Sequence, residues 1–189
     1  QDDQSIQQAA AVDDLRAVPP LLNASPGKQT VYGSEAGIDL HKLDMATFVD
    51  AEVGIALDGK IDEAVWQDIA YFDNMRVSIP DKGTPGTYAT KMRMFATEKG
   101  MYISADMEQP RDTLVRRMSR RDDFIDRDVF GVTLDVSGTA KIGYWFFIAL
   151  GDSQSDGKVL PERRYQRDWD GPWIGKSAVT DNGWRIEMF

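Results

Sequence analysis

The chain contains no cysteine, only one histidine (His41), and no apolar run long enough to cross a membrane. Without cysteine there can be no disulfide, thiolate nucleophile, iron–sulfur cluster or cysteine-ligated zinc. A single histidine excludes multi-histidine metal centres and leaves little capacity for acid–base catalysis at neutral pH. A transmembrane helix needs about 20 consecutive apolar residues, so we expect no membrane-spanning segment in this chain.

Positive charge is also scarce, because 22 basic residues face 31 acidic ones and the net charge is −9. Such a surface disfavours nucleic acids as partners and leaves cations and neutral ligands such as sugars as candidates. No nucleophile motif or phosphate-binding loop is present, so we do not expect an enzyme. The chain starts at Gln1 rather than Met, which predicts a processed, exported protein.

The 189 residues divide by composition into a tail and one domain. Residues 1–46 are rich first in Gln, Asp and Ala and then in Asn, Ser, Pro and Gly. We predict a largely irregular tail or linker there, with a docking arm for a partner as the alternative. Residues 47–189 carry the apolar patterns of a folded domain with a sizeable core.

Alternating apolar residues and turn sequences predict an all-β domain, an antiparallel β-sandwich of the jelly-roll type. One short helix is expected near residues 62–69, with Trp66 anchored in the core. We predict strands at 47–57, 74–79, 88–97, 101–107, 129–134, 141–150, 172–179 and 184–189.

Three stretches lead to sharper expectations. Residues 129–134 and 141–150 are apolar on both faces, which predicts two neighbouring inner strands. Residues 151–169 are polar and turn-rich, which predicts a long functional or mobile loop. Phe189 ends the chain within a strand, so we expect an unfinished edge strand, in a fragment or a domain completed by other strands.

Aromatic residues mixed with charged ones in 163–173 suggest a saccharide site, because a pyranose face stacks on a ring while its hydroxyls take planar polar partners. The set consists of Arg163, Arg164, Tyr165, Arg167, Asp168, Trp169, Asp170 and Trp173. The alternative is that the tryptophans close the sandwich and the charges form a solvated ion network.

Four acidic residues before the strand at 129–134 are candidates for calcium, an ion that takes six or more oxygen ligands. They are Asp122, Asp123, Asp126 and Asp128. Their order differs from an EF-hand loop, and the arginines between Arg116 and Arg127 could neutralise them instead.

Four segments together resemble carbohydrate-binding modules of family 9. The stretch Asp58–Trp66 is similar to that family's opening motif, and residues 90–103 to its next two strands. Asp128–Asp135 is similar to its central strand, and Asp181–Glu187 to its Gly-Trp strand ending in Glu. The resemblance implies a β-sandwich that binds carbohydrate without catalysis.

The motifs Arg120-Arg121-Asp122 and Asp168-Trp169-Asp170, with Trp173, resemble a variety of this family that precedes a predicted outer-membrane β-barrel in bacterial proteins of unknown function. This implies a periplasmic or cell-surface location at the outer membrane. A protein-interaction or gating domain for the barrel or an envelope protein, without sugar binding, is the alternative.

Family members hold the sugar between two tryptophans, and the first of these positions is Ile125 here, beside Phe124. The family's second tryptophan falls beyond Phe189 in this alignment. The resemblance therefore adds Phe124 to the saccharide-binding candidates. The complete set is Phe124, Tyr165, Arg167, Trp169, Asp170 and Trp173.

Overall fold

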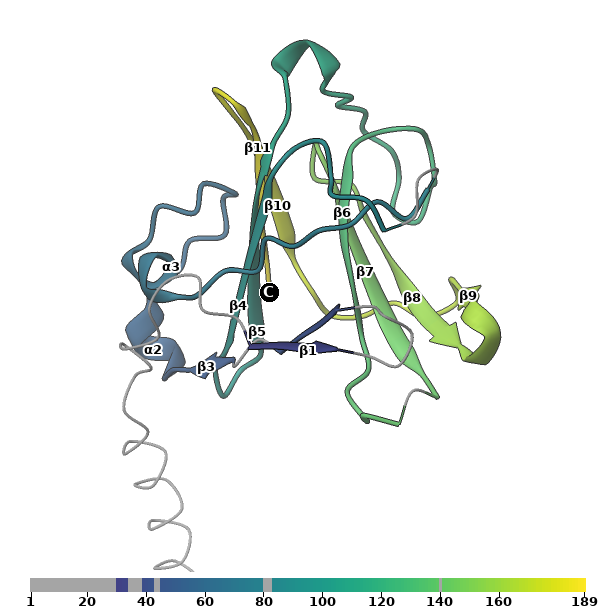
Figure 1. The fold of residues 1–189 in the computed structure, drawn as a ribbon, viewed down its shortest axis with the longest axis horizontal. Coiled ribbons are helices and arrows are strands. Elements are labelled where there is room, and N and C mark those ends of the chain that lie inside the picture. Colours follow the sequence, from purple (N-terminus) through teal and green to yellow (C-terminus); the bar gives the residue numbers. More distant parts are fainter. Residues whose placement is uncertain (1–29, 34–38, 43–44, 80–82, 140) are drawn as a thin grey trace, which may run out of the picture.

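Two packed β-sheets make up the domain (Figure 1). The computed structural model describes residues 30–33, 39–42, 45–79, 83–139 and 141–189; before residue 45, and at Arg163, it describes the backbone alone. The five-stranded sheet contains, in spatial order, β10 (Gly175–Thr180), β11 (Gly183–Met188), β5 (Met101–Glu108), β4 (Thr90–Ala96) and β3 (Ala46–Thr47). The four-stranded sheet contains β6 (Val129–Leu134), β7 (Gly143–Ala149), β8 (Gln154–Leu160) and β9 (Arg164–Gln166). The predicted all-β sandwich is confirmed.

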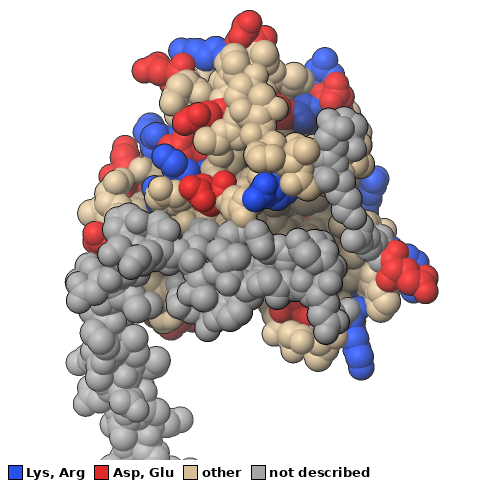
Figure 2. Space-filling view, viewed as in Figure 1, with Lys and Arg blue, Asp and Glu red and all other residues tan. Residues whose placement is uncertain are grey.

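All strand pairs in the two sheets are antiparallel except the short pair β3–β4. Within the predicted tail, β1 (Thr30–Gly33) and β2 (Asp39–Lys42) form a separate antiparallel pair, while residues 1–29 lie outside the described part. No helix in the described residues has the length and hydrophobicity needed to cross a bilayer. Acidic and basic side chains are intermixed on the face in Figure 2, so the negative charge is not gathered into one patch there.

The core between the sheets is built from alternate residues of the predicted hairpins. Ile103, Ala105 and Met107 of β5 pack with Phe130 and Ile148 of the opposite sheet. Met92, Met94 and Met101 border this cluster, so the inner face of β4 and β5 is rich in sulfur. Flexible thioether side chains suit such a position because they fill irregular gaps between two twisted sheets.

A second cluster lies on the outer side of the five-stranded sheet, beneath the helices α2 (Asp50–Val53) and α3 (Ala64–Asp68). Trp66 is fully buried there, 5.0 Å from the Phe95 ring, which confirms its predicted role as a core anchor. Its indole nitrogen donates to the carboxylate of Glu187 over 2.8 Å. The backbone N–H groups of Asp58 and Gly59 donate to the same carboxylate, over 3.1 and 2.9 Å.

Several strand predictions were wrong. Of the predicted strand at 47–57, only Thr47 lies in a strand, β3, and α2 and a segment without regular secondary structure follow it. At 74–79 the structure has only one isolated bridge, Arg76 with Pro85. The predicted long loop at 151–169 contains β8, a 3-10 helix (Pro161–Arg163) and β9. The strand at 129–134 has the predicted bounds and neighbours β7, but it is an edge strand rather than an inner one.

The strand that ends near Phe189 is not an edge strand, because β11 lies between β10 and β5. The N–H and C=O groups of Phe189 bond to the backbone of Ile174 over 2.8 Å each. Its ring lies 4.5 Å from that of Tyr102.

Candidate functional site

The outer face of the four-stranded sheet carries large aromatic side chains. Along β7, Tyr144, Phe146 and Ile148 point toward the five-stranded sheet, so Trp145 and Phe147 point away from it. Two glycines give these rings room. A Cβ at Gly157 would lie 2.6 Å from the Trp145 ring, and a Cβ at Gly131 would lie 2.1 Å from the Phe147 ring.

Three of the predicted saccharide-binding residues meet on this outer face. The Phe124 ring lies 5.9 Å from that of Trp145, and the Tyr165 ring lies 6.4 Å from it on the β9 side. Both are unusually open for aromatic residues, with 48% of Phe124 and 58% of Tyr165 exposed. The guanidinium of Arg167 lies 3.9 Å from the centre of the Phe124 ring. Arg167 therefore covers part of Phe124, and Tyr165 is the more open aromatic surface.

A cavity of about 150 Å³ adjoins this group. It is lined by Phe124, Ile125, Arg127, Val129, Phe147, Ala149, Ser153 and Ser155. The two serines are buried, Ser153 directly before β8 and Ser155 within it, while Phe124, Ile125 and Arg127 come from the segment before β6. The cavity therefore has an apolar wall, two hydroxyl groups and one cation.

The other two predicted aromatic residues lie on the opposite side of the sheet. Trp169 is 4.7 Å from the Tyr144 ring, and Trp173 is 5.7 Å from the Phe146 ring. Both line a second, apolar cavity of about 220 Å³ together with Val132, Met188 and Phe189 and other residues of the two sheets. Trp169 and Trp173 thus contribute to the sandwich interior, and they do not share a surface with Tyr165.

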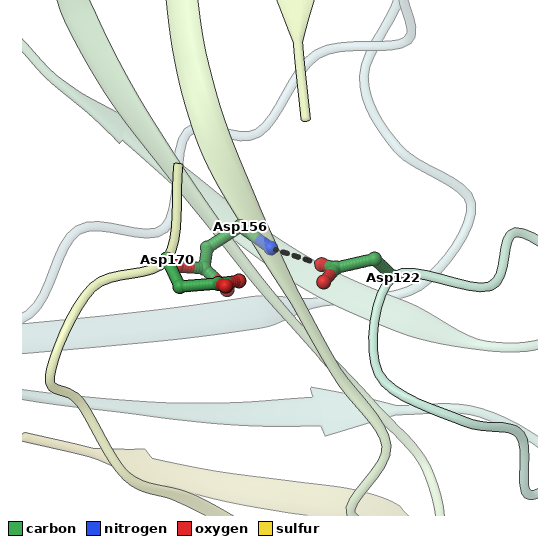
Figure 3. A group of neighbouring side chains, drawn as sticks. All are labelled: Asp122, Asp156 and Asp170. Atoms are coloured by element: carbon green, nitrogen blue, oxygen red, sulfur yellow. Dashed lines mark hydrogen bonds between the residues drawn. The ribbon is translucent and has the colours of Figure 1, made fainter. Parts of the chain in front are cut away.

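Asp170 belongs to a third group, with Asp122 and Asp156, whose carboxylate oxygens lie within 4.8 Å of one another (Figure 3). Asp156 is fully buried on β8 and accepts a hydrogen bond from the Gly171 N–H over 2.5 Å. Arg121 forms an ion pair with Asp156 and another with Asp170, the latter at 3.4 Å. One guanidinium thus already pairs with two of these three acids.

Asp122 has a structural role at the free edge of β8. Its N–H donates to the Gln154 carbonyl over 3.1 Å, and its carboxylate accepts from the Asp156 N–H over 3.0 Å (Figure 3). Because β9 pairs only with residues 158–160, these two bonds satisfy backbone groups that would otherwise be unpaired. The left-handed backbone of Asp122, with φ 63°, allows this arrangement.

The four predicted calcium ligands are not brought together. Asp128 accepts from the Val115 N–H over 2.7 Å and from the Gln109 side chain. Asp123 and Asp126 are exposed, and their backbone carbonyls accept from Arg127 and Arg117. Among the described residues, the acidic group within ligand distance shares only Asp122 with the predicted set.

Sequence reasoning missed the residues that support the outer face, namely Trp145, Phe147, Arg127, Ser153 and Ser155. Trp145 and Phe147 were assigned only to an inner strand. The available signal was the alternation along β7, in which large aromatic residues occupy both faces, together with the glycines at 131 and 157 that accommodate two of them.

No protein-family model matches the chain, and no curated protein is significantly similar to it in sequence. A search of solved structures found a carbohydrate-binding module of family 9 from Caldicellulosiruptor kristjanssonii, in complex with cellotriose. The TM-score is 0.51 at 12% sequence identity, and the match covers 71% of this chain and 62% of the module. The family resemblance is thus confirmed at the level of the fold: this chain has the fold of a family 9 carbohydrate-binding module.

Proposed function

We propose that this protein is a non-catalytic saccharide-binding module whose ligand face is the outer side of the four-stranded sheet. The observation that carries the proposal is the exposed Tyr165 ring, which lies against Trp145 as Phe124 does, together with Arg167 stacked on Phe124. The fold supports it, since the similar solved module binds cellotriose.

The chemistry of this face suits a sugar. One side of a pyranose ring is apolar and can stack on Tyr165, which is the most exposed of the clustered rings. Hydroxyl groups at the edge of the sugar would meet the planar N–H donors of Arg167. Trp145, nearly fully buried, supports the group from below, and its indole N–H is already bonded to the Lys158 carbonyl over 3.0 Å.

The carboxylates near this face are unsuited to glycoside hydrolysis. That reaction usually requires two carboxyl groups about 5–10 Å apart across the scissile bond. Among the described residues that line the Phe124 cavity there is no carboxylate. Asp156 and Asp122 are bound to Arg121 and to the backbone, so we assign the face to binding rather than to reaction.

Isothermal titration calorimetry with cellotriose and a panel of other oligosaccharides, both neutral and acidic, tests the proposal. Tyr165→Ala should weaken binding by about ten-fold, because stacking on one ring contributes roughly 0.5–1.5 kcal/mol. The matched control is Tyr88→Ala, which removes another half-exposed tyrosine that precedes β4 in the other sheet. Absence of binding across the panel at millimolar concentration, or an equal effect of both variants, would refute the proposal.

From the sequence resemblance alone, we also propose that the module is exported and acts on the periplasmic or cell-surface side of the outer membrane. A gating or protein-interaction role beside a downstream barrel stays the alternative prediction. Fractionation of the producing cells with an antibody against the module tests the location. Recovery with the cytoplasmic fraction would contradict it.

A further inference from the structure

The cavity at Phe124 has an unusual charge for this protein. Its described lining includes one cation, Arg127, and no anion, although the whole chain carries a net charge of −9. The other polar groups that line it are two serine hydroxyls: that of Ser153 donates to the Ser119 carbonyl over 3.2 Å, and that of Ser155 can donate to a ligand. An anionic group entering this cavity would meet a cation and the Ser155 hydroxyl without like-charge repulsion from the lining.

Arg127 is held by neutral acceptors, so its charge is not cancelled by a paired anion. It donates to the Ser119 hydroxyl over 2.7 Å and to the carbonyls of Arg117 and Asp123 over 3.2 and 3.0 Å. It has no ion pair with another described residue. Consistent with this, burial lowers the pKa of Arg127, and the charge of Asp123 opposes the shift.

A second cation, Arg167, lies against the Phe124 ring at the edge of the cavity. Arg167 stacks on Phe124, which itself lines the cavity, and makes no hydrogen bond or ion pair with another described residue. Stacking leaves the N–H donors at the edge of the guanidinium free to bind a ligand. A planar guanidinium matches carboxylate and phosphate groups in a two-point contact.

The size of the cavity indicates which part of a ligand it would take. At about 150 Å³ it is smaller than the several hundred Å³ typical of pockets for whole small ligands. A substituent can occupy it while the sugar ring stays outside, against Tyr165. We infer that the ligand is an anionic saccharide, a pyranose on Tyr165 whose carboxylate or phosphate lies between Arg167 and the cavity. This inference rests on the proposed function.

Titration of the full chain with four ligands tests the inference: trigalacturonate, its full methyl ester, glucose 6-phosphate and inorganic phosphate. Trigalacturonate should bind about ten-fold more tightly than the uncharged ester, as expected for charge-assisted hydrogen bonds. This preference should shrink as salt is added. A preference for glucose 6-phosphate over trigalacturonate would identify a phosphate as the anionic group.

Two arginine variants test whether the preference for the acidic ligand comes from Arg167 itself or from the overall positive charge of the surface. Arg167→Gln should remove most of the preference for trigalacturonate over its ester, because the affinity for trigalacturonate should fall further than the affinity for the ester. The control is Arg164→Gln, an exposed arginine at the start of β9 whose side chain faces away from Tyr165. It should retain the full preference.

The outcomes distinguish the inference from the proposed function. Equal binding of trigalacturonate and its ester, with loss in Tyr165→Ala, would overturn the inference and leave saccharide binding intact. Inorganic phosphate binding as tightly as glucose 6-phosphate, or an equal effect of the two arginine variants, would also overturn it. Absence of saccharide binding, neutral or acidic, would overturn both.

Discussion

The outer faces of the two sheets differ in whether their charged side chains have hydrogen-bonding partners within the chain. On the five-stranded sheet, the carboxylate of Glu187 is fully buried and accepts hydrogen bonds from Trp66, Asp58 and Gly59. On the four-stranded sheet, Arg167 is exposed and stacks on Phe124 without a hydrogen-bonding partner among the described residues. On the first face, Glu187 is hydrogen-bonded by other groups of the chain. On the second face, the N–H donors of Arg167 are open to solvent.

This difference explains the structural role of two segments that resemble family 9 modules. Asp58–Trp66 and Asp181–Glu187, two of the segments that resemble family 9 modules, meet at the Glu187 carboxylate across more than a hundred residues of sequence. A buried charge is costly unless it is fully hydrogen-bonded, and burial does raise the pKa of Glu187 against the opposing effect of its donors. These two segments therefore define a closed structural face, and the proposed ligand site lies on the other sheet.

The largest effect is expected from breaking the closed face with Glu187→Ala. Three N–H donors, two of them buried, would lose their acceptor, so the free energy of unfolding should fall by about 4 kcal/mol. Trp66→Phe removes one of the donors and keeps a large ring, and about 1–2 kcal/mol is expected. Urea denaturation followed by tryptophan fluorescence measures both.

Glu108→Ala is the matched control for Glu187→Ala, because Glu108 is exposed at the end of β5. A loss below about 0.5 kcal/mol is expected for it, as for most surface positions. If Glu187→Ala were as stable as this control, the carboxylate would not hold the two motif segments together. Ligand affinity measured below the unfolding transition should stay unchanged in Glu187→Ala, because the proposed site lies on the other sheet.

A smaller effect is expected from Gly157→Ala, which acts on the open face. An added Cβ would lie 2.0 Å from the Gln166 carbonyl oxygen and 2.6 Å from the Trp145 ring, so β9 or the ring must move. Overpacking of this kind costs roughly 1–3 kcal/mol. Because Tyr165 lies on β9, saccharide affinity should also fall in calorimetric titration.

Gly86→Ala serves as its control, since a Cβ there would meet nothing closer than 3.4 Å. Both stability and affinity should stay close to wild type in this variant. A Gly157→Ala protein that loses stability but binds saccharide normally would show that the position of β9 does not matter to the ligand.

Local sequence patterns predicted the hairpins of the five-stranded sheet and the bounds of β6, because apolar alternation and turn residues are properties of neighbouring positions. They failed at β8, whose polar sequence from Gln154 to Lys158 resembles a loop. Asp156 is stable in that strand because Arg121, 35 residues away, pairs with it. Gly157 provides the space for the Trp145 ring. Neither partner can be recognised from the local pattern.

The same limit explains the mixed outcome for the candidate site. Tyr165, Trp169 and Trp173 lie close together in a stretch that mixes aromatic and charged residues, and this composition suggested that they share one binding surface. The β9 strand places Tyr165 outward, whereas the chain then turns and brings Trp169 and Trp173 to the inner side, against Tyr144 and Phe146. Side-chain direction depends on the strand register, and a strand that is not predicted has no predicted register.

The smallest effect, confined to alkaline pH, concerns Tyr102 on the closed face. Burial, and then the 2.9 Å hydrogen bond to Asp50, raise the pKa of Tyr102 to about 12. Because its pKa in an unfolded chain is about 10, its contribution to stability is complete below pH 10 and is lost as the pH rises through 12. Tyr102→Phe should therefore show a shallower fall in stability across this range.

Lys99 must be separated from this effect, because its hydrogen bond to Asp50 raises its own pKa in the same direction. Lys99→Met should remove its part of the alkaline slope and keep the part due to Tyr102. Stability curves of both single variants and the double variant at several pH values between 9 and 12 resolve the two contributions. If the dependence of stability on pH were the same in Tyr102→Phe as in the wild type, ionised Tyr102 would be tolerated in the folded protein. The closed face would then admit more solvent than its hydrogen bonds and burial indicate.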